Sequence, residues 1–199
     1  MRRILAVVFA GALATALVAQ TPAAPKAAPL TPRPAGEFVI HMTDGSQKLL
    51  SSYKGKVVLM AFMHTTCSHC QHTSGILAKV NNEYAAKGVQ ILGVAFDQGA
   101  ERGIPMFLKI TGANFPVGFS TEDQVAKFMH ANGDYYVPML AFIDRTGTVR
   151  TQAISYGDPN PEVDKYLGEQ QETNIRGELD KLLKTPVHAT TATKQAPKS

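Results

Sequence analysis

The chain has 199 residues with 44% hydrophobic side chains, which suits one folded domain with appendages and excludes a wholly disordered protein. Two cysteines are too few for a small domain held together by disulfides. The net charge is +4, but six of the 20 cationic side chains and none of the 16 acidic ones lie outside residues 36–184. That span is left with a net charge of −2, so the basic pI of 9.1 belongs to the chain ends and does not indicate a nucleic-acid surface.

Residues 1–19 have the features of an export signal. Arg2 and Arg3 give a positive start, and the 16 residues Ile4–Ala19 that follow carry no charge. A membrane-spanning helix needs about 20 apolar residues, so the run fits a signal peptide better, although a short uncleaved anchor stays open. Small residues that offer cleavage sites stand at Ala14, Ala16 and Ala19. We therefore expect export to the periplasm.

Two further segments flank the predicted folded domain, which covers residues 36–184. Residues 20–35 hold five of the twelve prolines together with many alanines, a composition typical of an extended linker. Residues 185–199 are rich in Thr, Ala and Lys and are predicted to form a disordered tail. The remaining span is long enough to bury roughly two-thirds of its surface in a single core.

The first half of the domain predicts two buried strands joined by a helix. Val57–Met63 is a continuous apolar run, which is typical of a strand covered on both faces, and the largely apolar Val89–Phe96 is predicted to be a second buried strand. Between them, residues 67–87 repeat apolar side chains at helical spacing and end before Gly88, a residue suited to a helix C-terminus. Strands joined through a helix in this way are expected to be parallel.

The remaining elements are shorter, and the late strands are expected to be antiparallel. They begin with a hairpin around Asp44-Gly45, a short helix opened by Pro105 and ending at Gly112, and a helix from the capping box Thr121–Gln124 through His130. A hairpin of Met139–Ile143 and Thr148–Ser155 around the turn Asp144-Arg-Thr-Gly147 and a final helix over Pro161–Lys184 follow. The predicted fold class is α/β, with a mixed central sheet flanked by helices on both faces.

Both cysteines lie in one motif, Cys67-Ser68-His69-Cys70, which follows a buried strand and opens a helix. This context favours a redox pair, because the free N–H groups of a helix N-terminus stabilise a thiolate at Cys67. Cys70, one turn further, is placed to attack a mixed disulfide formed at Cys67. Ser68 and His69 lie between the cysteines and are expected to tune the pair. A passive disulfide is the alternative interpretation.

Three of the six histidines fall close to the cysteines, which raises a metal alternative. Cys67, Cys70 and His64 offer ligands for a soft metal such as copper(I), with His130 as a distant fourth ligand. His72 lies on a different side of the predicted helix and does not join them. A second Cys-x-x-Cys, which a zinc site of the common type needs, is missing from the sequence.

Four segments together resemble the thioredoxin-like superfamily, most closely its exported TlpA/ResA branch in the redoxin and AhpC/TSA-like group. They are KGKVVLMAFMHTTCSHC, VQILGVAFD, NFPVGFSTEDQVAKFM and YVPMLAFIDRTGTV. The resemblance implies a thioredoxin-like fold with Cys67 as nucleophile and Cys70 as resolving cysteine. It also implies that Val137–Pro138 is a cis-proline step beside the pair, where the backbone of Val137 docks an extended substrate.

The function implied by this resemblance is an exported thiol–disulfide oxidoreductase that acts more often as a reductant. It needs no bound cofactor, because the cysteines carry the electrons. Its expected partners are cysteine-containing exported proteins and a membrane electron donor, and not nucleic acid. The chain departs from the family in having no Trp before the pair and in carrying Ala61 where thioredoxins have a buried acid.

Two rival functions follow from neighbouring families. A peroxiredoxin-like peroxidase usually shows P-x-x-x-T-x-x-C, but Met60 and His64 stand at the proline and threonine positions. A copper-binding assembly factor similar to Sco proteins uses C-x-x-x-C and a distant histidine, and the cysteine spacing here is one residue shorter.

Overall fold

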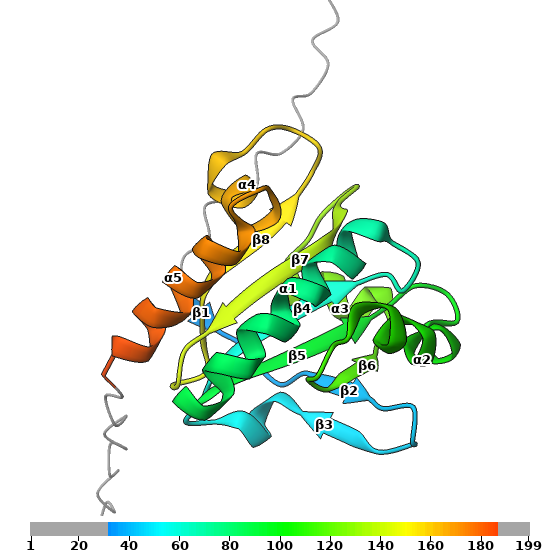
Figure 1. Cartoon of the computed structure of the whole chain (residues 1–199), viewed down its shortest axis with the longest axis horizontal. Coiled ribbons are helices and arrows are strands. Elements are labelled where there is room, and N and C mark those ends of the chain that lie inside the picture. Colours follow the sequence, from blue (N-terminus) through cyan, green and yellow to red (C-terminus); the bar gives the residue numbers. More distant parts are fainter. Residues whose placement is uncertain (1–31, 187–199) are drawn as a thin grey trace, which may run out of the picture.

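The computed structural model describes residues 32–186, so the predicted export signal and most of the linker and tail lie outside the described residues. These residues form one eight-stranded sheet with helices on both faces (Figure 1). The strands are β1 (Arg33–Pro34), β2 (Val39–His41), β3 (Gln47–Leu49), β4 (Val57–Met63), β5 (Val89–Ala95), β6 (Val117–Phe119), β7 (Tyr136–Ile143) and β8 (Thr148–Ser155). The helices are α1 (Ser68–Tyr84), α2 (Ala100–Thr111), α3 (Glu122–Met129), α4 (Pro161–Leu167) and α5 (Gln171–Lys184). The predicted fold class is confirmed.

The sheet is mixed, with the order β1-β8-β7-β4-β5-β6-β2-β3. β4, β5 and β6 run parallel, as expected for strands joined by helices, while β7 pairs antiparallel with β4. All seven residues of β4 are buried, because this strand lies mid-sheet with packed layers on both faces. This explains why the sequence of β4 is a continuous apolar run rather than an alternating one.

The two faces of the sheet carry different helices. α1, α2, α4 and α5 bury apolar side chains against one face, and α3 packs against the other (Figure 1). On the first face the largest contributions include Leu77, Phe107, Phe142, Tyr166 and Leu179. On the second face, Phe38, Phe62 and Phe128 form an aromatic cluster in which Phe38 meets the other two rings edge to face. Within the described span, no helix is both long and apolar enough to cross a bilayer.

Local sequence signals set several element ends as predicted. Thr121 is the N-cap of α3 and accepts a hydrogen bond from the backbone N–H of Gln124 at 3.3 Å. Gly88 adopts the left-handed conformation after the turn that ends α1. Asp144 closes the β7–β8 hairpin by accepting hydrogen bonds from Thr146 and Thr148.

The prediction for Pro105 is wrong, because α2 begins at Ala100 and the proline lies inside it. Proline lacks the N–H that would bond the carbonyl of Glu101, four residues back. Both residues are exposed, so the lost hydrogen bond falls on the solvent side of the helix. The helix starts earlier because the loop after β5 turns at Gly99, which has a left-handed φ of 76°.

The C-terminal helix and the linker also differ from expectation. The predicted final helix is divided into α4 and α5, because Gly168 takes an extended conformation between them. The sheet also starts before residue 36, since Arg33–Pro34 pairs with Val149 and Thr148 of β8. Proline is tolerated in β1 because this strand lies at the edge of the sheet.

Candidate active site around the cysteine pair

The turn from β4 into α1 places Cys67 at the start of the helix. Cys67 is the N-cap residue, with extended backbone angles (φ −78°, ψ 120°). Its Sγ accepts a hydrogen bond from the backbone N–H of Cys70 at 3.2 Å. Its own backbone N–H donates to the carbonyl of His64 at 3.3 Å. The side chain therefore points at the free N–H groups of the helix, as the motif predicts.

The two cysteines lie in different environments. Both are free thiols, but Cys67 is half-buried, whereas Cys70 is 0% exposed. Burial raises the pKa of the Cys70 thiol, and the hydrogen bond with Cys67 raises it further. Cys70 therefore stays a neutral thiol at neutral pH. An incoming disulfide meets Cys67 first, and Cys70 lies behind it.

The predicted docking residues lie beside Cys67. The Val137–Pro138 peptide bond is cis, as the resemblance implies, and it lies at the start of β7. The Cys67 Sγ is 3.8 Å from the carbonyl oxygen of Val137. Because β7 is the antiparallel neighbour of β4, the start of β7 meets the end of β4, where the cysteine motif begins. Strand pairing thus brings together residues 70 positions apart.

Asp97 belongs to the site, although the sequence alone does not place it there. Its carboxylate accepts hydrogen bonds from the backbone N–H of Thr65 at 2.9 Å and from the Thr65 hydroxyl at 2.6 Å. The carboxamide of Gln71 donates to the Thr65 carbonyl at 3.0 Å, so the N–H and the carbonyl of Thr65 are both hydrogen-bonded. Asp97 follows β5, the parallel neighbour of β4, and the ends of adjacent parallel strands meet at one edge. The position of Asp97 directly after the second predicted strand is the sequence signal by which it could have been found.

Below the cysteines, α1 is tied to the C-terminal helices through buried polar groups. The carboxamide of Gln171 donates to the hydroxyl of Thr73 at 3.0 Å and to the Tyr166 carbonyl at 2.7 Å. Thr73 lies one turn after Cys70, and Gln171 is 1% exposed. Ala61, at the position of the buried acid of thioredoxins, is fully buried and has no titratable group. These polar contacts connect α4 and α5 to the site, and the sequence does not predict them.

The remaining predicted residues are spread around the pair. Ser68 and His69 are exposed in the first turn of α1. The His64 ring packs edge-on against Phe96 with ring centroids 4.5 Å apart, and His130 is an exposed residue at the end of α3. Among residues 32–186, no three His, Cys, Asp or Glu side chains gather in a way that could hold a metal ion. The alternative copper set of Cys67, Cys70, His64 and His130 is therefore not assembled.

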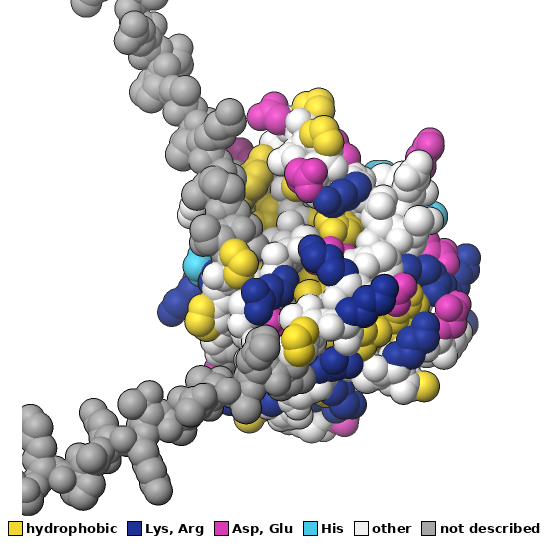
Figure 2. All heavy atoms as spheres, turned by 90° about the vertical axis from the view of Figure 1, so that its left-hand side faces the viewer, with side chains coloured by type: hydrophobic (Ala, Val, Ile, Leu, Met, Phe, Trp, Pro, Cys, Tyr) yellow, Lys and Arg dark blue, Asp and Glu magenta, His cyan; other side chains and the backbone are white. Residues whose placement is uncertain are grey.

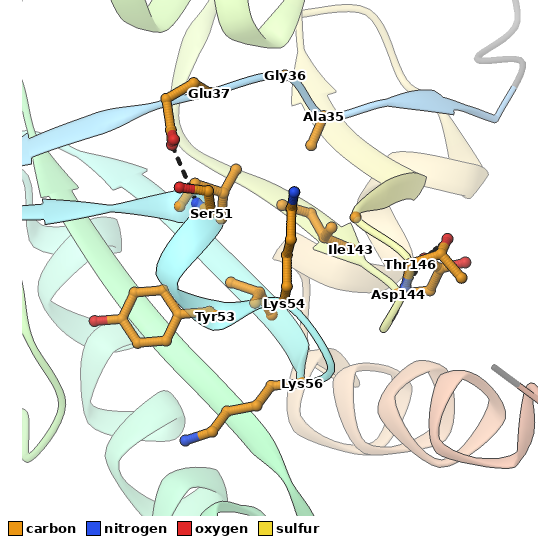
Figure 3. A pocket seen from close by; sticks show the side chains of 13 residues that line it. Ala35, Gly36, Glu37, Ser51, Tyr53, Lys54, Lys56, Ile143, Asp144 and Thr146 are labelled. Carbon is orange, nitrogen blue, oxygen red and sulfur yellow. Dashed lines mark hydrogen bonds between the residues drawn. The ribbon is translucent and has the colours of Figure 1, made fainter. Parts of the chain in front are cut away.

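A hollow of about 280 Å³ lies far from the cysteines. It is lined by Lys54 and Ile143 among others, and Figure 3 shows Lys54 extending toward Ile143 and Ala35. This hollow is at the opposite end of β4, about 20 Å along the strand from the cysteine motif. The face that carries α5 shows lysines and arginines interspersed with carboxylates and apolar side chains (Figure 2). Neither feature adds a group to the cysteine site.

The profile of the AhpC/TSA family matches residues 32–152, well over half of the chain. The chain belongs to this family. The thiol-disulfide oxidoreductase ResA of Geobacillus thermodenitrificans is 28% identical over 116 residues, which cover 58% of this chain and 64% of that protein. ResA of Bacillus cereus is 27% identical over 148 residues, covering 74% and 76%. The family assignment and these relatives make this a ResA/TlpA-type thioredoxin-like protein.

Solved structures agree with the fold. A candidate DsbE-type thiol:disulfide interchange protein from Chlorobium tepidum superposes with a TM-score of 0.60 at 25% identity, covering 76% of this chain and 96% of that one. Another thiol:disulfide interchange protein of the thioredoxin family from Chlorobium tepidum gives a TM-score of 0.60 at 22% identity, covering 78% and 99%. The second likeness concerns the fold alone.

Proposed function

We propose that this protein is an exported thiol–disulfide oxidoreductase that reduces disulfides of protein clients. The observation that carries the proposal is the position of Cys67. Its sulfur is at once the N-cap of α1, 3.2 Å from the Cys70 N–H, and 3.8 Å from the Val137 carbonyl. The relatives named ResA, a thiol-disulfide oxidoreductase, support this chemistry.

The reaction needs only the two cysteines and the client. The Cys67 thiolate attacks one sulfur of a client disulfide, and the other client sulfur leaves as a thiolate that takes up a proton. Cys70 then loses its proton and attacks the Cys67 sulfur, which releases the second client thiol. Two electrons pass from the pair to the client, and a Cys67–Cys70 disulfide remains. No cofactor takes part in this cycle.

The asymmetry of the pair fits this order of events. Cys67 is accessible and attacks first, while the buried Cys70 stays protonated until the mixed disulfide lies beside it. The backbone of Val137 is offered to an extended client segment, which gives docking with little dependence on client sequence. Ser68 and His69, exposed next to the pair, are placed to tune its potential.

Regeneration and location complete the proposal. A dithiol of a membrane-bound electron donor reduces the Cys67–Cys70 disulfide and becomes oxidised in its place. Export through residues 1–19, cleaved or kept as a short anchor, brings the domain to the periplasm where such a donor and oxidised clients occur. A reduction potential near about −270 mV supports reduction as the direction, whereas one near about −120 mV indicates an oxidase.

The direct assay is reduction of insulin disulfides by the full chain with dithiothreitol as donor. We expect wild-type activity well above the dithiothreitol background, and loss of that excess in Cys67→Ser. Insulin reduction that survives Cys67→Ser contradicts the proposal. Hydrogen peroxide is the second substrate in the same assay, since the AhpC/TSA match also favours a peroxidase. If the reduced protein consumes peroxide rapidly, its function is peroxide reduction and not the proposed reduction of client disulfides.

A further inference from the structure

A groove of about 340 Å³ lies between α1 and α2. Its α1 wall consists of Gln71, His72, Gly75, Ile76 and Lys79, and Ile110 lies on its α2 wall. The groove lies apart from the start of β7. α2 packs against β5 and β6, whereas β7 lies on the other side of β4 in the sheet. The site described above leaves this groove unused.

The groove begins next to Cys67. Gln71 and Gly75 follow Cys67 at four and eight residues, so the three residues share one side of the helix. Gln71 is held in place by its hydrogen bond to the Thr65 carbonyl. At the same end, α2 comes so close that a Cβ on Gly103 would lie 2.5 Å from the Thr65 hydroxyl oxygen. Gln71, one turn after Cys67, is therefore the lining residue that marks the end of the groove nearest the nucleophile.

The floor of the groove is open because Gly75 has no side chain. A Cβ at this position would find only the Thr111 carbonyl oxygen at 3.8 Å, an ordinary contact. Glycine is a poor choice for the interior of an α-helix, where alanine is more stable. The glycine at position 75 therefore leaves the floor of the groove open, although it makes the long helix α1 less stable than alanine would.

The chemistry of the walls is apolar and basic. Ile110 on the α2 wall is 57% exposed, and Met106, one turn earlier on α2 and outside the lining, is 59% exposed, which is unusual for large apolar side chains so close together. Ile76 lines the groove from α1 as Ile110 does from α2, and Lys79 and His72 are the titratable groups on the lining. None of the described residues that line the groove is acidic. The walls therefore complement a segment with an apolar side chain and a carboxylate.

We propose that this groove binds the client chain next to its reacting cysteine, with an apolar side chain between Ile76 and Ile110 and a carboxylate at Lys79. The inference rests on the proposed function and adds a client preference to it. The helix rises about 1.5 Å per residue, so Ile76 and Lys79 lie roughly 14 and 18 Å from Cys67 along α1. An extended chain covers about 3.3 Å per residue, which places these client residues about four and six positions from the cysteine.

The test uses synthetic 13-residue peptides with one central cysteine, blocked as the mixed disulfide with thionitrobenzoate. One peptide carries isoleucine four residues and glutamate six residues from the cysteine on both sides. The matched peptide carries serine and lysine at those positions. The reduced protein releases thionitrobenzoate in a single turnover, and the second-order rate constant is read from its absorbance. Ellman's reagent, a disulfide that has no peptide segment to bind in the groove, is the control substrate.

We expect the wild-type protein to react at least about tenfold faster with the isoleucine–glutamate peptide, which buries an apolar side chain. Gly75→Leu fills the floor and should bring the two peptides to within about twofold, while Gly75→Ala, the control, keeps most of the preference. Lys79→Glu should remove the advantage of glutamate. All variants should react with Ellman's reagent at the wild-type rate.

The outcomes separate this inference from the proposed function. A wild-type protein that reacts equally with both peptides, or a preference unchanged in Gly75→Leu, overturns the groove while leaving disulfide exchange intact. Failure of the wild-type protein to react with Ellman's reagent and with both peptides instead contradicts the exchange chemistry. If thermal unfolding shows that Gly75→Leu is not folded, Ile110→Ser at the exposed wall replaces it, with the same expected loss of preference.

Discussion

Cys67 and Cys70 are chemically identical side chains that the fold makes unequal. Cys67 lies at the half-buried start of α1, where its sulfur accepts a backbone N–H, and Cys70 is fully buried one turn later. Burial, followed by the contact with Cys67, raises the pKa of Cys70 above its ordinary value. The difference in exposure, together with the raised pKa of Cys70, assigns the attacking and resolving roles.

This asymmetry predicts selective alkylation of the reduced protein. At neutral pH, iodoacetamide should modify Cys67 alone, because it reacts with an accessible thiolate and Cys70 is buried and protonated. Cys70 should become reactive only in unfolded protein or at a pH well above the ordinary cysteine pKa. Intact-mass and peptide mass spectrometry count one adduct in the native state and two after denaturation. Equal modification of both native cysteines at neutral pH is incompatible with the assignment.

Asp144 is the residue on which the β7–β8 hairpin depends. It is 2% exposed and accepts hydrogen bonds from Thr146, Thr148 and the guanidinium of Arg150. Burial acts to raise the pKa of Asp144, but these hydrogen bonds outweigh it and hold the pKa below the usual range. A carboxylate whose folded pKa is depressed stabilises the protein above its unfolded pKa and loses this effect as the pH falls through the folded one.

Asp144→Asn should therefore lower the free energy of unfolding by about 1–3 kcal/mol at pH 6, because it weakens charge-assisted hydrogen bonds in a buried turn. The difference from wild type should shrink as the pH falls below about 4, where the wild-type carboxyl begins to take up its proton. Urea unfolding at several pH values measures both effects. Asp134→Asn at an exposed position is the control, and a difference that grows toward acid pH would refute the argument.

At the scale of the elements, α4 and α5 are fastened to α1 by a buried carboxamide. Gln171→Leu removes the donor to Thr73 and to the Tyr166 carbonyl and leaves both without this partner in a buried place. We expect a loss of about 1–3 kcal/mol in the free energy of unfolding. Exposed Gln170→Leu, one residue earlier, should change it little. Equal stabilities of the two variants in urea unfolding would show that the carboxamide does not fasten these helices.

Elements with local signals could be predicted from the sequence, and those that depend on distant partners could not. The capping box at Thr121 and the turn at Asp144 depend on hydrogen bonds to residues two to four positions away. β1 forms by pairing with β8, which is far away in the sequence. β6 has only three residues, too few for a recognisable pattern. In β6, a Cβ on Gly118 would lie 2.3 Å from the His41 carbonyl oxygen, so its glycine reflects the approach of another strand. Periodicity within a short segment carries no such information.

At the scale of the whole molecule, the site is assembled from three separate parts of the sheet edge. The cysteine motif follows β4, Asp97 follows β5, and Val137 begins β7. The cysteines were predictable because strand, motif and helix are contiguous, and Val137–Pro138 because of the family resemblance. Asp97, Gln171 and the groove beside Gly75 depend on how strands and helices pack together. Sequence spacing alone therefore does not place them.

The positions of the histidines predict that the protein does not retain copper(I). The copper set from the sequence is dispersed, with His64 packed on Phe96 and His130 at the end of α3. The purified protein with reduced cysteines should therefore lose copper(I) to an excess of bathocuproine disulfonate, as measured by absorbance of the chelate. Retention of one equivalent, lost in His130→Ala, would restore the copper alternative.

The most direct test of the central claim is to trap the intermediate at Cys67. Cys70→Ser removes the resolving sulfur, so the mixed disulfide with an oxidised client peptide should accumulate, and intact mass should rise by the mass of one peptide. Peptide mapping should place the bond at Cys67, and dithiothreitol should reverse it. Cys67→Ser should form no adduct at the same peptide concentration. An adduct that forms in Cys67→Ser as readily as in Cys70→Ser would contradict the assignment of Cys67 as the nucleophile.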